Sequence, residues 1–342
     1  MAQFKKASDI HVGVVGYGGA FNMGRRHLGD TQKAGMTPVA VTEIDPARLD
    51  VAKQDFPGIE GFDTVEKMLK GSDVHLVVLI TPHNTHAPLA LQCLRAGRSV
   101  ITEKPFAITT AECDATIREA KKRKLLLSTY HNRHWDGCVL EALRRIRREK
   151  AIGDVYRIDA HTGGYGQPGD WWRSSRSISG GILYDWGVHL LEYALQIVDS
   201  EIVEVSGHAK AGVWKTRWKS DTNEDAACVV VRFGNGAWLS LTVSSLESNP
   251  RPGMLEITGT KGTYIFDSGT YEIIQQRGDQ KIVTKGRNAP SQWERYYQNV
   301  ADHLTKGEPL VITPEWARRP IHIIDLANQS AKKGAAIKAK YK

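Results

Sequence analysis

The sequence lacks the features that mark several classes of protein. Cysteine occurs only four times, at positions 93, 113, 138 and 228, and no pair has the CxxC spacing of a zinc or redox site. That count is also far too low for a disulfide scaffold. The longest aliphatic run, residues 76–80, is much shorter than a membrane span, and the first residues hold no apolar stretch typical of a secretory signal. We therefore expect a cytoplasmic protein with no membrane partner.

The composition is that of a globular protein with a large core. The chain has 342 residues, of which 41% are hydrophobic and 25% charged. Its length predicts about two domains. The net charge of +8 permits an anionic ligand. The basic residues gather only at 144–150 and 332–342, which we interpret as solvated helix faces, and we expect no nucleic-acid partner.

The first third of the chain predicts a nucleotide-binding domain. Short apolar runs at residues 10–15, 37–43, 74–80, 99–102 and 125–129 alternate with segments of helical pattern. This alternation predicts βαβ units and a doubly wound parallel sheet with helices on both faces. We assign residues 1–129 to this α/β domain, a Rossmann fold.

A glycine cluster follows the first predicted strand. Gly16, Gly18 and Gly19 stand between strand and helix, where backbone N–H groups can approach a pyrophosphate. Glu43 closes the second predicted strand, where a carboxylate binds ribose hydroxyls and repels a 2′-phosphate. The pattern therefore favours NAD over NADP.

The glycine fingerprint is imperfect at its third position. Phe21 stands where the third glycine is expected, and the next glycine is Gly24. Two explanations stay open: the helix starts later after a longer loop, or Ala20 takes the close-packing role.

Residues 130–342 have a different pattern. Predicted strands follow one another at residues 155–161, 202–209, 226–233, 237–244, 254–258 and 262–266, and helices close the chain. Gly234, Asn235 and Gly236 form a hairpin signal between two of these strands. We therefore predict a second α/β domain with a largely antiparallel sheet.

Two local clusters carry side chains suited to chemistry. Glu103, Lys104 and Pro105 follow a parallel strand at the edge where such sheets bind ligands. Asp185 and His189 are spaced i, i+4, so on a helix they share one face. An ammonium, an imidazole and a carboxylate could converge on one hydroxyl group. The alternative is a solvated lysine and a helix surface pair.

The histidines also include two HxxH pairs. His83 with His86 and His131 with His134 could contribute to a metal site, but the chain has no HExxH and no cysteine partner for them. We expect no metal.

In combination, these motifs resemble the glucose–fructose oxidoreductase/inositol dehydrogenase (Gfo/Idh/MocA) family along nearly the whole chain. The matching pieces are the Gly16 turn, residues 40–43, 81–87, 96–105 and 130–133, and the Gly180-Gly181-x3-Asp185-x3-His189 motif. The resemblance implies a Rossmann domain followed by an α/β domain on an open, mostly antiparallel sheet. It also implies a homo-oligomer that assembles through this C-terminal sheet.

The resemblance further implies an NAD(P)-dependent dehydrogenase that acts on the CH–OH group of a sugar, sugar derivative or cyclic polyol. By motif position the catalytic set is Lys104, Asp185 and His189, and whether Lys104 or His189 is the formal base stays open. The implied cofactor-binding residues are Gly16, Gly18, Gly19, Ala20, Glu43, Thr81, Pro82, Asn84, His86, Glu103 and Lys104. The candidate substrate-binding residues are Arg133, Trp172, Arg173, Asp185 and His189.

Two other functions use the same parts. Some relatives keep NAD bound, oxidise C3 of a glycoside transiently and eliminate the aglycone. Others are dinucleotide-binding sensors without activity. This function is disfavoured because the chain retains Lys104, Asp185 and His189. One departure from the family pattern is Glu192, where many members have Asp, and it affects a supporting contact.

Overall fold

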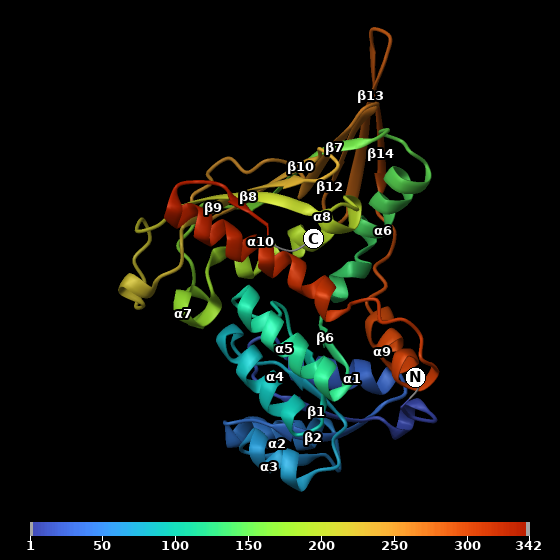
Figure 1. Cartoon of the computed structure of the whole chain (residues 1–342), viewed down its shortest axis with the longest axis vertical. Helices are drawn as coiled ribbons and strands as arrows, with labels where there is room; N and C mark the ends of the chain where they lie inside the picture. The colour runs from blue at the N-terminus through green and yellow to red at the C-terminus, as the bar shows by residue number, and fades with distance from the viewer. Residues whose placement is uncertain (1–2, 340–342) are drawn as a thin grey trace. The chain divides into compact units, whose positions relative to one another are not determined.

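The computed structural model describes residues 3–339 and divides the chain into two compact units. The first unit comprises the residues up to Asn132 together with Glu294–Arg318. The second comprises Arg133–Trp293 and the residues from Arg319 onward. Figure 1 follows the chain through both units in colour from blue to red.

A parallel sheet forms the centre of the first unit. Its order within the described residues is β3-β2-β1-β4-β5-β6. The strands are β1 (His11–Val15), β2 (Thr37–Thr42), β3 (Glu60–Phe62), β4 (Leu76–Leu79), β5 (Ser99–Thr102) and β6 (Leu127–Thr129). β4 is wholly aliphatic and buried, as expected for a strand covered on both faces. Because the order reverses between β1 and β4, ligands are expected at the carboxyl ends of these strands.

Helices connect the parallel strands and cover the sheet (Figure 1). α1 packs on β1 and β2, whereas α4 packs on β4 and β5. Local sequence explains where these helices begin: Asp45 caps α2 ahead of Pro46, and Thr109 with Glu112 forms a capping box on α5. The helices are α1 (Met23–Lys33), α2 (Pro46–Asp55), α3 (Val65–Gly71), α4 (His86–Arg95) and α5 (Thr110–Arg123). The predicted Rossmann sheet is confirmed.

A late segment packs with the first unit. The Tyr296 hydroxyl, on helix α9 (Arg295–Lys306), donates to Ser128 Oγ at 2.9 Å, and the Tyr296 ring stands edge-on to Tyr130 at 4.9 Å. The contacts therefore group Glu294–Arg318 with the first unit, although the domain prediction placed these residues in 130–342. Contacts of buried aromatic side chains decide this grouping, and the sequence does not show which residues such side chains contact.

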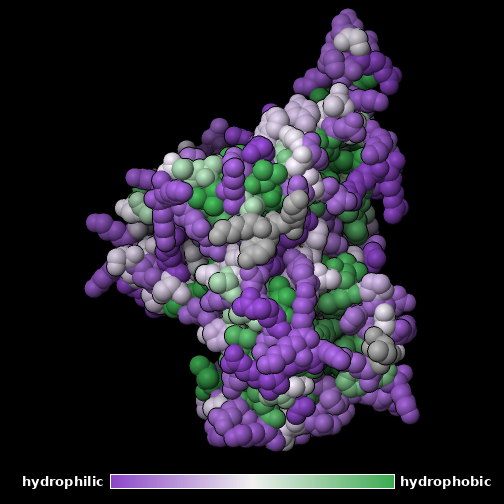
Figure 2. Space-filling model, viewed as in Figure 1, coloured by the Kyte–Doolittle hydropathy of each residue, from purple (hydrophilic) through white to green (hydrophobic). Residues whose placement is uncertain are grey.

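The second unit is built on a mixed, mostly antiparallel sheet, as predicted. Its order within the described residues is β14-β13-β12-β11-β7-β10-β9-β8-β15, and β7 and β10 pair in parallel. The strands are β7 (Val155–Gly163), β8 (Ile202–Lys210), β9 (Ala226–Phe233), β10 (Trp238–Ser244), β11 (Leu255–Gly259), β12 (Gly262–Phe266), β13 (Thr270–Arg277), β14 (Gln280–Arg287) and β15 (Ile337–Lys338). In Figure 1 the β13–β14 hairpin projects from the sheet, and Figure 2 shows that its tip is hydrophilic.

Helices cover one face of this sheet. α8 packs on β7 and β10. Helix α10 comes so close to β8 that a Cβ on Gly207 would lie 2.1 Å from the Ala327 carbonyl oxygen. The helices are α6 (Gly137–Leu143), which continues as a π-helical turn at Arg144–Arg148, α7 (Arg176–Ser179), α8 (Trp186–Ile197) and α10 (Pro314–Lys333).

Within residues 3–339, no helix combines the length and the apolar character needed to cross a membrane.

Candidate active site

The turn after β1 has a backbone that only glycine accommodates. Gly16 has φ +100°, and its N–H donates to the Thr42 carbonyl at 2.8 Å. A Cβ at this position would lie 2.3 Å from the Ile80 carbonyl oxygen. Gly18, Gly19 and Ala20 are exposed, and nothing lies within 4 Å of a Cβ built on Gly18. This turn therefore leaves a path for a ligand to approach the backbone.

Gly24 supplies the close packing that the fingerprint assigns to its third glycine. α1 begins at Met23, after Asn22 in the left-handed conformation, so the loop is longer than usual. Gly24 is buried, and a Cβ on it would lie 2.6 Å from Tyr17 Cδ2 and 2.8 Å from the Gly16 carbonyl oxygen. Of the two explanations, the later helix start holds. The exposed Ala20 does not take the packing role.

We expect Gly24→Ala to destabilise the protein by about 1–2 kcal/mol, because the overpacking outweighs the gain in helix propensity. Gly29→Ala is a matched control on the same helix, since no atom lies within 4 Å of its Cβ. That variant should be more stable than the wild type by about 0.5–1 kcal/mol. Urea unfolding measures both changes. Equal effects of the same sign would contradict the packing argument.

Glu43 joins the end of β2 to the glycine turn. One carboxylate oxygen accepts the Tyr17 N–H at 2.6 Å, and the other accepts those of Ile44 at 2.8 Å and Asp45 at 3.1 Å. These bonds hold the carboxylate beside the turn, and the oxygen that accepts only the Tyr17 N–H keeps a further lone pair for a ligand.

Arg48 is a cation at this turn that the sequence analysis missed. Its Nε donates to the Tyr17 carbonyl at 3.0 Å, and a Cβ on Gly19 would lie 3.1 Å from its Nη1. Its only sequence signal is a position in the helix that follows Glu43, which many surface arginines share.

The turns after β4 and β5 are tied together by a histidine. His86 is fully buried, and its Nδ1 lies 2.7 Å from the Pro105 carbonyl and its Nε2 2.9 Å from the Thr81 carbonyl. Its visible role is thus to hold the two turns in place. Thr81 and Pro82 are half-buried and Asn84 is exposed at the same turn.

Glu103 anchors the backbone of Lys104. Its carboxylate accepts the Lys104 N–H at 3.0 Å and contacts His27 Nε2 at 2.9 Å. On the other side of the ring, the Tyr297 hydroxyl lies 2.5 Å from His27 Nδ1. Burial opposes ionisation of Glu103, but the His27 hydrogen bond and the attraction of His27 and Lys104 outweigh it. The pKa of this carboxyl therefore lies below its usual value.

The relay from Tyr297 through His27 to Glu103 has no sequence signal, because these three residues are distant from one another in the chain. Lys104 itself is half-buried beyond the end of β5.

In the second unit, a glycine pair shapes the start of α8. Gly180 and Gly181 have φ +93° and +134°, and a Cβ on Gly181 would lie 2.7 Å from Glu224 Oε2. The same Glu224 oxygen accepts the Ile182 N–H at 3.2 Å. These contacts set the direction in which the chain enters Asp185 and α8.

Asp185 lies directly before α8 and pairs with Arg173. The Asp185 carboxylate lies 2.6 Å from Arg173 Nη1, and its side chain remains 45% exposed. The Arg173 guanidinium also stacks over Trp172 at 4.9 Å. Trp172 is half-buried, so it is not a core tryptophan. This group offers a carboxylate, a guanidinium and an aromatic face to a ligand of the second unit.

His189 lies one turn further along α8. It is 5% exposed, and its ring stands edge-on to Trp186 at 5.7 Å. The guanidinium of Arg133 stacks over Trp186 at 4.9 Å, and Arg133 Nη1 lies 3.1 Å from Asp136. The structure thus brings Arg133 close to the start of α8.

Glu192, also on α8, is buried and makes two polar contacts. Its carboxylate lies 2.5 Å from His134 Nδ1 and accepts from Gln196 Nε2 at 3.0 Å. Glu192 thus joins α8 to the segment that holds His134.

The predicted catalytic residues belong to both units. Lys104 lies in the first, whereas Asp185 and His189 lie in the second. That the three side chains meet around one substrate stays a prediction.

Comparisons with known proteins agree with this architecture. Residues 10–131 match the model of an oxidoreductase family with an NAD-binding Rossmann fold, and residues 140–265 match the GFO/IDH/MocA C-terminal domain. The chain is 30% identical to the uncharacterized oxidoreductase YdgJ of Escherichia coli, over 97% of this chain and 99% of that protein. It is 25% identical to IolW of Bacillus subtilis, a scyllo-inositol 2-dehydrogenase (NADP(+)), over 97% of each chain.

A solved structure has the same fold over both units. An NAD-binding protein from Listeria innocua matches with a TM-score of 0.80 and 25% identity, over 96% of this chain and 97% of that one.

Proposed function

Since this chain belongs to the GFO/IDH/MocA family of oxidoreductases, we propose that it is an NAD-dependent dehydrogenase that oxidises a carbinol carbon of a cyclic polyol or sugar. One observation carries this proposal. The Gly16 turn, the Glu43 carboxylate and Lys104 follow β1, β2 and β5, so all three lie at the carboxyl edge of one parallel sheet. The dehydrogenase name of the IolW relative supports a polyol substrate.

The residues of the first unit fit a dinucleotide. Gly16 to Ala20 would hold the pyrophosphate through backbone N–H groups near the start of α1, and Glu43 would hold the ribose. Thr81, Pro82 and Asn84 follow β4 and would line the nicotinamide side of the crevice. When bound, nicotinamide supplies the hydride acceptor that the protein itself lacks.

The polar side chains of the motifs handle the substrate and its proton. Lys104 Nζ would hydrogen-bond the substrate oxygen, and either Lys104 or His189 would take the hydroxyl proton. Asp185 would orient the substrate. Trp172 would pack on C–H groups of the ring while Arg133 and Arg173 donate hydrogen bonds to its hydroxyls.

The function is tested by purifying the protein and assaying a panel of inositols, monosaccharides and glycosides with NAD and with NADP. We expect steady formation of reduced cofactor with at least one polyol or sugar. Protein that carries NAD through purification and cleaves glycosides without net NADH formation would instead support transient C3 oxidation. Cofactor binding without turnover of any panel member would support a sensor.

Glu43 is expected to set the preference for NAD. Glu43→Gln removes the charge that repels a 2′-phosphate and keeps one acceptor oxygen, which serves either the Tyr17 N–H or those of Ile44 and Asp45. The ratio of kcat/KM for NAD to that for NADP should fall on the order of 10–10²-fold, since a juxtaposed like charge costs several kcal/mol. Asp45→Asn is the control, because Asp45 is exposed and Asn also caps a helix. If the ratio falls equally in both variants, the preference comes from the overall negative charge near the site and not from Glu43 itself.

We also propose that the outer face of the second sheet joins two copies of the chain. Two large apolar side chains are exposed on neighbouring strands of this sheet: Trp238 on β10 is 41% exposed and Val230 on β9 is 37% exposed. Light scattering of the purified protein tests this, and a monomer at assay concentration would contradict it.

A further inference from the structure

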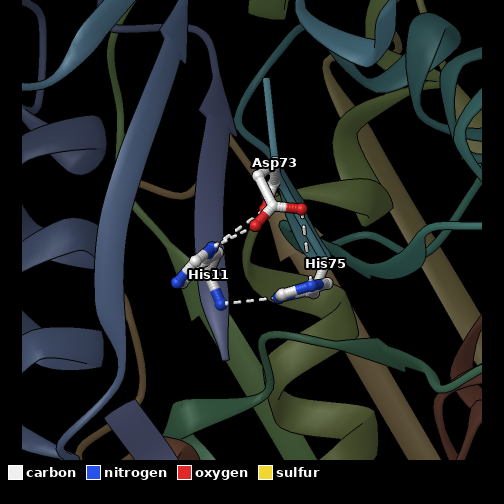
Figure 3. A group of neighbouring side chains, drawn as sticks. All are labelled: His11, Asp73 and His75. Atoms are coloured by element: carbon white, nitrogen blue, oxygen red, sulfur yellow. Dashed lines mark hydrogen bonds and ion pairs between the residues drawn. The ribbon is translucent and has the colours of Figure 1, made fainter. Parts of the chain in front are cut away.

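Two histidines and an aspartate gather at the amino edge of the first sheet. His11 is the first residue of β1, and Asp73 and His75 lie just before β4, which pairs with β1 in parallel. Figure 3 shows the three side chains facing one another across the two strands. Gly16 follows the other end of β1, so this group is separate from the proposed dinucleotide site.

The side chains are close enough to share one ion. His11 Nδ1 lies 3.1 Å from Asp73 Oδ2, and His75 Nε2 lies 3.8 Å from Asp73 Oδ1. One ligand atom from each residue lies within 4.8 Å of the others. Ligand atoms that each lie about 2.1 Å from a tetrahedral zinc ion, a typical distance from zinc to nitrogen or oxygen, are about 3.4 Å apart. Only small movements of these side chains are therefore required.

Ring packing holds the two histidines of the cluster in place. The rings of His11 and His75 lie 4.9 Å apart at 30°, and the His75 ring also packs against Phe4 at 5.0 Å. The two histidine side chains are 30% exposed and Asp73 is 77% exposed, so an ion reaches the group directly from solvent. The carboxylate adds a negative charge that attracts a divalent cation beside the two neutral imidazoles.

We propose that His11, Asp73 and His75 bind one divalent transition-metal ion of the zinc class. Two imidazoles and one carboxylate form a mixed nitrogen and oxygen donor set that suits Zn²⁺ and its neighbours in the first transition row. Mg²⁺ and Ca²⁺ prefer oxygen donors and are not expected to compete. Three protein ligands leave a fourth tetrahedral position for water.

Binding requires a new tautomer at both histidines. His11 Nδ1 donates to the backbone carbonyl and to the carboxylate of Asp73, each at 3.1 Å, so its proton must move to Nε2 before Nδ1 can bind an ion. His75 Nδ1 accepts the backbone N–H of His11 at 3.1 Å, so the proton of a neutral His75 ring lies on Nε2. An ion bound at Nε2 moves that proton to Nδ1, and the His11 N–H then loses its acceptor. Losing such a bond weakens binding by roughly tenfold, so we expect moderate affinity. The His11 amide resonance should shift when the ion binds.

The experiment titrates Zn²⁺ into chelator-treated protein from which any affinity tag has been removed, and measures heat of binding and thermal unfolding. We expect one ion per chain and a higher unfolding midpoint, because the ion joins β1 to the segment before β4. Co²⁺ should give the visible absorption of a tetrahedral site. Asp73→Asn should weaken binding at least tenfold, and His75→Gln should abolish it.

His208→Gln is the matched control, because His208 is exposed and lies in the second unit. It should bind Zn²⁺ as the wild type does. Asp73 is exposed, so Asp73→Asn tests the site without disturbing the core, and it should leave dehydrogenase activity unchanged. The proposal is wrong if the wild type binds no Zn²⁺, or if Asp73→Asn and His75→Gln both bind it as tightly as the wild type.

Discussion

Lys104→Met should lower kcat/KM on the order of 10²–10⁴-fold with the best substrate of the panel. Methionine keeps much of the length of the side chain but removes the ammonium that we place on the substrate oxygen. The backbone of this residue is held by Glu103, which His27 contacts in turn, so the substitution should leave the loop in position. Steady-state kinetics and NADH binding by fluorescence separate chemistry from cofactor binding.

The control for this experiment is Lys67→Met. Lys67 is exposed on α3 and pairs with Asp63 at 2.7 Å, far from the motif in sequence. Its loss should change kcat/KM by less than about twofold, since surface pairs contribute little. If Lys104→Met turns over substrate like the wild type, Lys104 has no part in the chemistry. If it loses NADH affinity instead, its role is to seat the cofactor.

His189→Gln should reduce kcat on the order of 10²–10⁴-fold, the usual contribution of a positioned acid or base. Glutamine keeps hydrogen-bonding capacity but cannot take a proton near neutral pH. For a general base, kcat/KM rises with pH as the base loses its proton, and this rise should disappear in the variant whose residue is the base. The pH profiles of His189→Gln and Lys104→Met therefore identify which residue accepts the hydroxyl proton.

Because His189 is almost fully buried on α8, its replacement also requires a check of folding. The unfolding midpoint of His189→Gln should stay close to that of the wild type. His208→Gln, an exposed substitution in the same unit, should keep full activity. Wild-type turnover and an unchanged pH profile in His189→Gln would exclude His189 as the base.

Five strands of the first unit could be predicted because each is a short apolar run that ends in turn residues, whereas the short and largely exposed strand β3 (Glu60–Phe62) and helix α3 after it were not predicted. The run at 74–80 illustrates this, since the buried strand β4 (Leu76–Leu79) lies inside it. Consecutive strands with hairpin signals likewise predicted the kind of sheet in the second unit and its strands β7 to β12, whereas β13, β14 and β15 were not predicted. Only contacts in space could show that Tyr296, late in the chain, packs on Tyr130 in the first unit.

The glycine fingerprint shows the limit of spacing arguments. Spacing left Ala20 and Gly24 as alternatives, because it cannot say where a helix starts after a loop of unusual length. In the structure the left-handed Asn22 delays α1, and the contacts of Gly24 with Tyr17 and the Gly16 carbonyl leave no room for a side chain. The close contacts of Gly24 thus show that Gly24, and not Ala20, takes the role of the third glycine of the fingerprint.

By itself, the sequence determined the two kinds of sheet, the glycine turn with its acidic partner Glu43, and the motifs that carry Lys104, Asp185 and His189. These features depend on local pattern, which neighbouring residues encode. Tertiary structure alone decided the relay from Tyr297 through His27 to Glu103, the position of Arg48 on the glycine turn, and the meeting of His11 with Asp73 and His75. Such contacts join residues far apart in the chain, and they arise only when folding brings separate strands and helices together.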